Sequence, residues 1–150
     1  MKWTLISNTS PGIKEYHLLQ DEKVLIVLKC SLEQLSVRIH FEEEHLVYFM
    51  EDTGYAGRIV FKNAYGVDQG RFSHNSRNNT GRLQINDDIF DYNIVDNTQP
   101  KLIVHQHNQQ QALAVCQIPA IPLRQTSWYE QAGMILSICR FATTPVLRKT

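Results

Sequence analysis

The segment from residue 128 to residue 142 constrains the fold most, because it reads as a helix that is apolar on every side. After Glu130, its only strongly polar residues are Gln131 and Arg140. A helix without a polar face is either buried inside a protein or embedded in a membrane. About 14 residues rise only ~21 Å, which is too short to cross a bilayer. We therefore expect a buried helix that the rest of the chain surrounds.

The sequence also indicates where this helix begins and how closely it packs. Ser127 to Glu130 has the form of a capping box, in which the serine side chain and the glutamate side chain each bind the other's backbone NH. Gly133 and Ser137 lie four residues apart, on one face of the helix. Side chains this small predict a close approach between that face and the surrounding strands.

Most of the preceding chain alternates between apolar and polar residues, or has short apolar runs bounded by turn residues, and both patterns predict strands. The clearest case is the run Leu35, Val37, Ile39 and Phe41, which alternates with polar residues. The expected strands cover residues 3–7, 15–20, 24–30, 35–41, 46–50, 58–62, 81–85, 89–95, 101–107 and 112–118. Residues 63–80 are predicted to be a polar loop around a short strand near 71–74.

The expected fold class is therefore mainly β, an antiparallel β-barrel wrapped around one buried C-terminal hydrophobic helix. Regular strand spacing of roughly 8–12 residues is typical of barrels and sandwiches. The chain has 150 residues, which fits a single domain over 1–150 with strands roughly at 3–118 and the helix at 128–142. Its 43% hydrophobic and 20% charged residues are ordinary for a globular domain.

The charge balance limits the partners that we expect. The 15 Lys and Arg residues equal the 15 Asp and Glu residues, whereas nucleic-acid-binding proteins carry a basic excess. We therefore expect no nucleic-acid partner. Neutrality also weakens repulsion between copies of the chain, which makes a homo-oligomer an open expectation.

The cysteines and the absence of targeting segments indicate a cytoplasmic protein. Cys30, Cys116 and Cys139 are odd in number, form no CxxC pair and lie in apolar runs, so we expect buried free thiols. The apolar stretch near Met1 is too short for a signal peptide, and no run reaches the ~18 apolar residues of a transmembrane segment. The sequence contains no recognised cofactor or catalytic motif, so no cofactor is expected.

Three features together resemble the tubby C-terminal-like superfamily, which includes LURP-one-related proteins and phospholipid scramblases. They are an early strand with Trp3 followed by hairpins, the pattern from Gly81 to Tyr92 (GRLQINDDIFDY), and the apolar helix from Trp128 to Phe141. The resemblance covers nearly the whole chain and implies a barrel around a central helix. It also implies a binding role at anionic lipid headgroups or a membrane surface.

The chain departs from this superfamily at the positions that carry activity. No basic motif of the tubby branch can be matched residue by residue, and neither the cysteine cluster nor the calcium-binding segment of scramblases is present. The chain is also shorter than typical members. The resemblance therefore bears more on the fold than on any activity.

The main candidate for a ligand site is the polar stretch between residues 62 and 82. Lys62, Arg71, Arg77 and Arg82 flank it and could bind a phosphate or carboxylate in bidentate fashion, whereas the ordinary interpretation is scattered solvated charge. We therefore expect a non-enzymatic binding module, with these four residues as the ligand-binding site. Its expected partner is an anionic lipid, a membrane surface or another protein.

Two alternatives stay open. His105 and His107 would lie on one face of a strand, where they are weak candidates for metal ligands in a small-molecule-binding barrel or a small enzyme. A metal site needs a further ligand, and Asn108 and three glutamines follow instead. The other alternative is a structural protein that self-associates through its strands.

Overall fold

The structure is a computed structural model that describes residues 1–150 except 11, 55–56, 76, 96–97, 120–127 and 144–150. For residues 7–10 and 128 the backbone alone is described.

Eleven strands and one helix make up the regular structure of the described residues. The strands are β1 (Lys2–Ser10), β2 (Ile13–Gln20), β3 (Lys23–Ser31), β4 (Ser36–Phe41), β5 (Glu44–Asp52), β6 (Arg58–Lys62), β7 (Asp68–Asn75), β8 (Thr80–Ile85), β9 (Asp88–Val95), β10 (Lys101–Gln106) and β11 (Ala114–Gln117), followed by the helix α1 (Trp128–Thr143).

The strands form a closed barrel in which each strand pairs with its neighbours in sequence. All sequential pairs are antiparallel, and the barrel closes where β1 meets β11 in parallel at Lys2 and Gln117. A parallel seam follows from the odd number of strands, because alternating directions leave the first and the last strand pointing the same way. Closure removes the unpaired sheet edges that an open sheet would expose.

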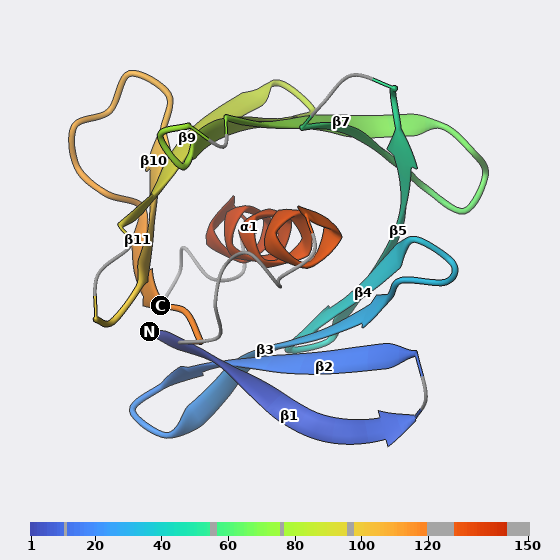
Figure 1. Cartoon of the computed structure of the whole chain (residues 1–150), viewed down its shortest axis with the longest axis horizontal. Helices are drawn as coiled ribbons and strands as arrows, with labels where there is room; N and C mark the ends of the chain where they lie inside the picture. Colours follow the sequence, from blue (N-terminus) through green and yellow to red (C-terminus); the bar gives the residue numbers. More distant parts are fainter. Residues whose placement is uncertain (11, 55–56, 76, 96–97, 120–127, 144–150) are drawn as a thin grey trace.

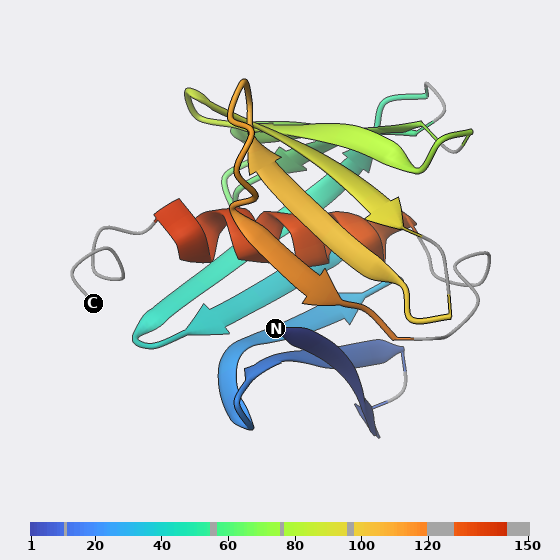
Figure 2. The ribbon, with the colours of Figure 1, turned by 90° about the vertical axis from the view of Figure 1, so that its left-hand side faces the viewer.

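The helix α1 runs through the interior of this barrel (Figures 1 and 2). Every residue from Ala132 to Cys139 is buried, and the apolar side chains among them belong to one hydrophobic cluster with the inward-facing residues of the strands. At Gly133 the approach is close, since an added Cβ would lie 3.0 Å from a methyl carbon of Val37. The hydroxyl of Ser137 donates to the carbonyl of Gly133 at 2.6 Å, so this polar side chain is satisfied within the helix.

One charged side chain is enclosed with the helix. Glu130 in the first turn of α1 is 0% exposed, and its carboxylate accepts a hydrogen bond from the Tyr16 hydroxyl at 2.9 Å. The ammonium group of Lys14 lies 3.1 Å from the same oxygen and is 39% exposed. Burial, followed by the negative charge of Glu130, raises the pKa of Tyr16, so the phenol keeps its proton and donates. Two residues of β2 thus fix the first turn of the helix.

The mainly β barrel with a buried C-terminal helix is confirmed, and the small residues Gly133 and Ser137 lie where the helix packs closely. The short strand predicted near residues 71–74 is present, but the loop predicted around it is too long, because β7 extends over Asp68–Asn75 and pairs with β6 and β8. The proposed cap at Ser127 lies outside the described residues. Among the described helices, none is long and apolar enough to span a membrane.

The three cysteines are buried free thiols, as the sequence predicts. Burial raises the pKa of Cys30 to about 12 and that of Cys116 to about 11, and it also raises the pKa of Cys139. Because the thiolate is the reactive form, these residues act as small core side chains rather than as nucleophiles.

Candidate functional site

A hollow of about 960 Å³ lies over strands β7 to β10 and the ends of the turns that join them. We call it the arginine groove because three arginines line it. Its described lining consists of Gly57, Arg58, Ser73, His74, Asn75, Arg77, Thr80, Gly81, Arg82, Asp91, Tyr92, Asn93 and His105.

One row of side chains, held in register across five strands, forms the floor of the arginine groove. Arg58 pairs with Ser73, Ser73 with Arg82, and Arg82 with Asp91, which also faces His105. These residues alternate with buried, barrel-facing neighbours, so they point to the outside of the barrel. Arg58 and Arg82 stand two strands apart, a backbone separation of ~10 Å at ~4.8 Å per strand. Arginine side chains from both positions can reach a ligand above Ser73.

The turn between β7 and β8 adds a third guanidinium to one end of the groove. The backbone NH of Arg77 donates to the Asn75 side chain at 3.0 Å, and the Thr80 hydroxyl donates to the Asn78 side chain at 2.7 Å. Asn79 adopts a positive φ of 53°, a conformation that asparagine tolerates better than most residues. Hydrogen bonds of this kind fix the turn that carries Arg77.

A second hollow of about 440 Å³ adjoins the arginine groove and shares Arg58, Ser73 and Arg82 with it. Arg71 lines this second hollow, one row further along β7. Within the described part of the chain, no carboxylate forms an ion pair with Arg71 or Arg77. No carboxylate of the described residues therefore competes with an external anion for these two guanidinium groups.

Asp91 is the acidic side chain of the groove, and it is fully engaged. Its two oxygens accept hydrogen bonds from Arg82 Nε at 2.9 Å and from His107 Nδ1 at 2.8 Å. Partial burial works against ionisation, but the hydrogen bonds and charges of His107 and Arg82 outweigh it and lower the pKa of Asp91. The carboxylate is therefore ionised at neutral pH, and it holds Arg82 in place through Nε alone.

His74 and Tyr92 close the inner side of the groove. The two rings stack with centroids 5.8 Å apart, and His74 Nδ1 lies 2.5 Å from the Tyr92 hydroxyl. Burial lowers the pKa of His74 and raises that of Tyr92, so a neutral imidazole and a protonated phenol share this hydrogen bond. The Tyr92 ring crosses the position opposite Gly81, where an added Cβ would overlap its hydroxyl. Glycine at position 81 is thus the reason that this pair can form.

The lowered pKa of His74 predicts a loss of stability on mild acidification. Between the folded-state pKa and the unfolded value of ~6.5, the unfolded chain binds more protons, so stability falls as the pH is lowered. The contribution of neutral His74 is complete above ~6.5 and is lost as the pH falls toward the folded-state pKa. We expect His74→Gln to flatten this pH dependence, as measured by urea unfolding between pH 5 and 7.5. A variant with the same slope as the unmodified protein would contradict this assignment.

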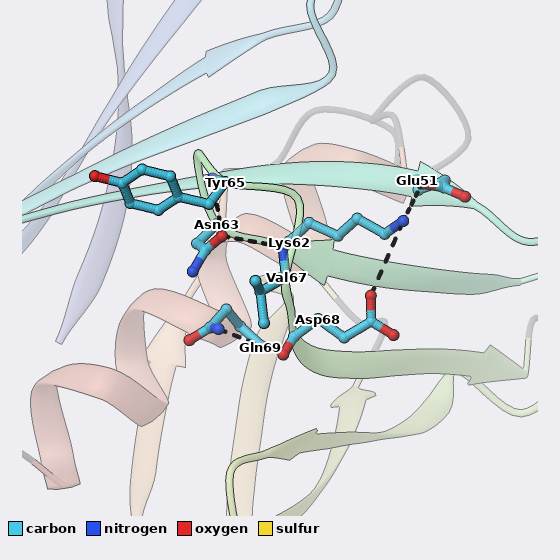
Figure 3. Close-up of polar contacts among 7 residues, drawn as sticks. All are labelled: Glu51, Lys62, Asn63, Tyr65, Val67, Asp68 and Gln69. Atoms are coloured by element: carbon cyan, nitrogen blue, oxygen red, sulfur yellow. Dashed lines mark hydrogen bonds and ion pairs between the residues drawn. The ribbon is translucent and has the colours of Figure 1, made fainter.

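Lys62, the remaining residue of the predicted site, lies outside the lining of both hollows. Its ammonium group binds Glu51 at 2.7 Å and lies 3.9 Å from Asp68 (Figure 3). The hydrogen bond from Lys62 to Glu51 and the nearby negative charges raise the pKa of Lys62. Two carboxylates thus surround the charge of Lys62, which sets it apart from Arg71 and Arg77.

The next five residues form an ordered turn between β6 and β7 (Figure 3). The Asn63 side-chain oxygen accepts from the backbone NH groups of Tyr65 and Val67 at 2.9 and 3.0 Å. This turn holds Tyr65 in solvent, with 91% of its surface exposed.

The two histidines considered as metal ligands occupy different environments. His105 lines the arginine groove, whereas His107 follows the end of β10 and donates to Asp91. Among the described residues, no group of three or more His, Cys, Asp or Glu side chains could hold a metal ion. The carboxylate beside these histidines is Asp91, and Arg82 and His107 already use both of its oxygens.

The structure places Arg77 in the arginine groove, Arg71 in the adjoining hollow and Arg82 in both. It adds Arg58, which also lines both hollows and was not predicted from the sequence. Arg58 follows a glycine at the start of a strand, and only the register between β6 and β7 places it opposite Ser73. The chemistry of this surface is recognition of an anion by guanidinium groups, with amide and hydroxyl donors from Asn75, Asn93 and Thr80 beside them.

No family model, curated protein or solved structure matches this chain.

Proposed function

We propose that this protein is a non-enzymatic binding module that holds an anionic ligand on the outer face formed by the arginine groove and the adjoining hollow. The observation that carries the proposal is the gathering of four arginines on one outer face, of which Arg71 and Arg77 have no ion-pair partner among the described residues. Planar guanidinium groups bind phosphate and carboxylate through parallel hydrogen bonds, and are the usual choice for such ligands.

The proposed ligand carries phosphate groups, as an anionic lipid headgroup or as a free phosphate ester. The groove is open to solvent on the outer surface, and its floor carries the guanidinium groups of Arg58 and Arg82, which suit a charged ligand. The resemblance to tubby-like proteins supports the headgroup as one source of that phosphate. A binding role without catalysis agrees with the groove chemistry, because burial keeps the Tyr92 phenol protonated.

We expect the double variant Arg71→Ala/Arg77→Ala to weaken binding of anionic ligands by about 10-fold or more. Each guanidinium lost removes charge-assisted hydrogen bonds of ~1.5–3 kcal/mol, and ~1.4 kcal/mol corresponds to a factor of ten. Two probes separate the sources of phosphate. Sedimentation with vesicles that contain phosphatidic acid tests a lipid surface, and titration calorimetry with inorganic pyrophosphate tests a free ligand.

Arg38→Ala is the matched control, since Arg38 also points outward from a strand and lies outside the lining of both hollows. Binding should weaken at high salt if it rests on exposed charge. Equal binding by the double variant and by Arg38→Ala would show that the arginine groove is not the ligand site.

A further inference from the structure

Asp91 is the one acidic side chain in the described lining of the arginine groove, and it stands opposite Arg82 in the row that forms the floor. We infer that Asp91 is a built-in counter-anion, which lowers the affinity of the groove for anions, and most of all beside Arg82. This inference rests on the proposed function.

The geometry shows that Asp91 already occupies the position of a bound anion. One carboxylate oxygen accepts from Arg82 Nε and the other accepts from His107 Nδ1, at 2.9 and 2.8 Å. This is the arrangement that a ligand carboxylate or phosphate would adopt between the same two donors. A ligand that approaches Arg82 therefore meets a guanidinium whose charge is largely cancelled.

Arg71 and Arg77 have no such counter-charge among the described residues. No ion pair joins either of them to a carboxylate, and Arg71 lies one row away from Asp91 along the strands. Coulombic repulsion falls with distance and with solvent screening, so Asp91 weakens the positive field most at Arg82 and less at the arginines that lie further away.

The substitution Asp91→Asn removes the negative charge of this side chain but keeps an oxygen that can position Arg82. Its side-chain oxygen can still accept from Arg82 Nε, and its amide group can donate to a neutral His107. The orientation of Arg82 is kept while one negative charge is removed. We therefore expect Asp91→Asn to tighten binding, and by a factor that rises with the charge of the ligand.

The experiment is titration calorimetry at pH 7.5 with acetate, inorganic phosphate and pyrophosphate, at low and at high salt. For pyrophosphate we expect Asp91→Asn to bind about 3- to 10-fold more tightly than the unmodified protein, with a smaller gain for phosphate and the smallest for acetate. The gain should shrink at high salt. Asn93→Asp, which adds a carboxylate two residues further along the same outer face of β9, should weaken pyrophosphate binding.

Glu33→Gln is the control, because it makes the same change in net charge at an exposed turn residue outside the groove. It should alter affinity by less than about 2-fold, as expected for a distant screened charge. Thermal unfolding of each variant checks that the fold is kept.

The outcomes separate the inference from the function on which it rests. Suppose that the Arg71→Ala/Arg77→Ala variant binds pyrophosphate more weakly than the unmodified protein. If Asp91→Asn then binds it equally well or more weakly, the inference about Asp91 is wrong and the proposed function stands. Absence of binding by both the unmodified protein and Asp91→Asn would overturn the proposed function and the inference together.

Discussion

Gly81→Ala is expected to lower the free energy of unfolding by about 3 kcal/mol, the upper end of the range for overpacked sites. An added Cβ would overlap the backbone oxygen of Ser73 and the ring and hydroxyl of Tyr92. A side chain can rotate away from such an overlap, but a backbone oxygen in a paired strand moves only if the strand moves with it. The expected strain therefore falls on the pairing of β7 with β8. Urea unfolding monitored by circular dichroism measures the change.

Gly66→Ala provides the comparison for this variant. No atom lies within 4 Å of a Cβ at Gly66, and the strain there comes only from its positive φ of 79°. We expect a loss of about 1 kcal/mol, the size of the penalty for a left-handed alanine. Two variants with the same midpoint of unfolding would rule out the tight crossing of Tyr92 over Gly81.

Lys14→Met is expected to lower the free energy of unfolding by about 2–4 kcal/mol, although Lys14 is the more exposed partner of its ion pair. The substitution removes a cation that lies 3.1 Å from the carboxylate of Glu130, and that carboxylate is 0% exposed. Breaking a fully buried pair from one side costs ~3–5 kcal/mol, because the remaining charge is uncompensated. The value expected here is lower, since water reaches the lysine end of the pair.

Glu130→Gln should cost less than Lys14→Met, because the new amide side chain still offers an oxygen to the Tyr16 hydroxyl and the Lys14 ammonium can turn to solvent. Adding Glu130→Gln to Lys14→Met should recover part of the lost stability, since the buried charge is then gone. A double-mutant cycle by urea unfolding measures this coupling. Simple additivity of the two substitutions would show that the pair contributes nothing.

The sequence was most informative where a local pattern decides the structure. Ser36–Phe41 forms a strand with its apolar residues inward, and the turn at Asn86 has the positive φ of 53° that its residue type favours. The apolar circumference of residues 128–142 predicted a buried helix, because no other environment suits such a helix. These features depend on neighbours in sequence and on burial, both of which can be read from the residues.

The length of β7 was underestimated from the sequence, because its apolar signal is weak. Of its barrel-facing positions, Phe72 is the only large apolar residue, while Gly70 and His74 occupy the others. Gly70 and Gly81 are needed where strands or rings come close. The sequence predicts a loop at Gly70, whereas it places Gly81 at the start of a strand.

The sequence predicted which kind of side chain forms the site, but not which residues on neighbouring strands stand beside one another. Alternation shows which side of a strand a residue faces, whereas the register decides which residues on other strands stand opposite it. A register shift between Phe61 and Lys62 places Lys62 opposite Asp68, whereas Arg58 remains in line with Ser73. No local pattern reveals that bulge, so the sequence selected Lys62 and passed over Arg58.

The place of α1 in the chain order has a consequence for how the protein is made. All eleven described strands precede the helix, so they leave the ribosome before the segment around which they close. Until then the barrel-facing side chains cannot pack against the helix. The seam between β1 and β11 cannot pair before Gln117 has been synthesised, because Lys2 pairs with that residue. Such long-range pairing is slow, and apolar strands that are not yet packed are prone to aggregate. We therefore expect folding to be completed after synthesis of the helix, with the nascent chain depending on chaperones until that point.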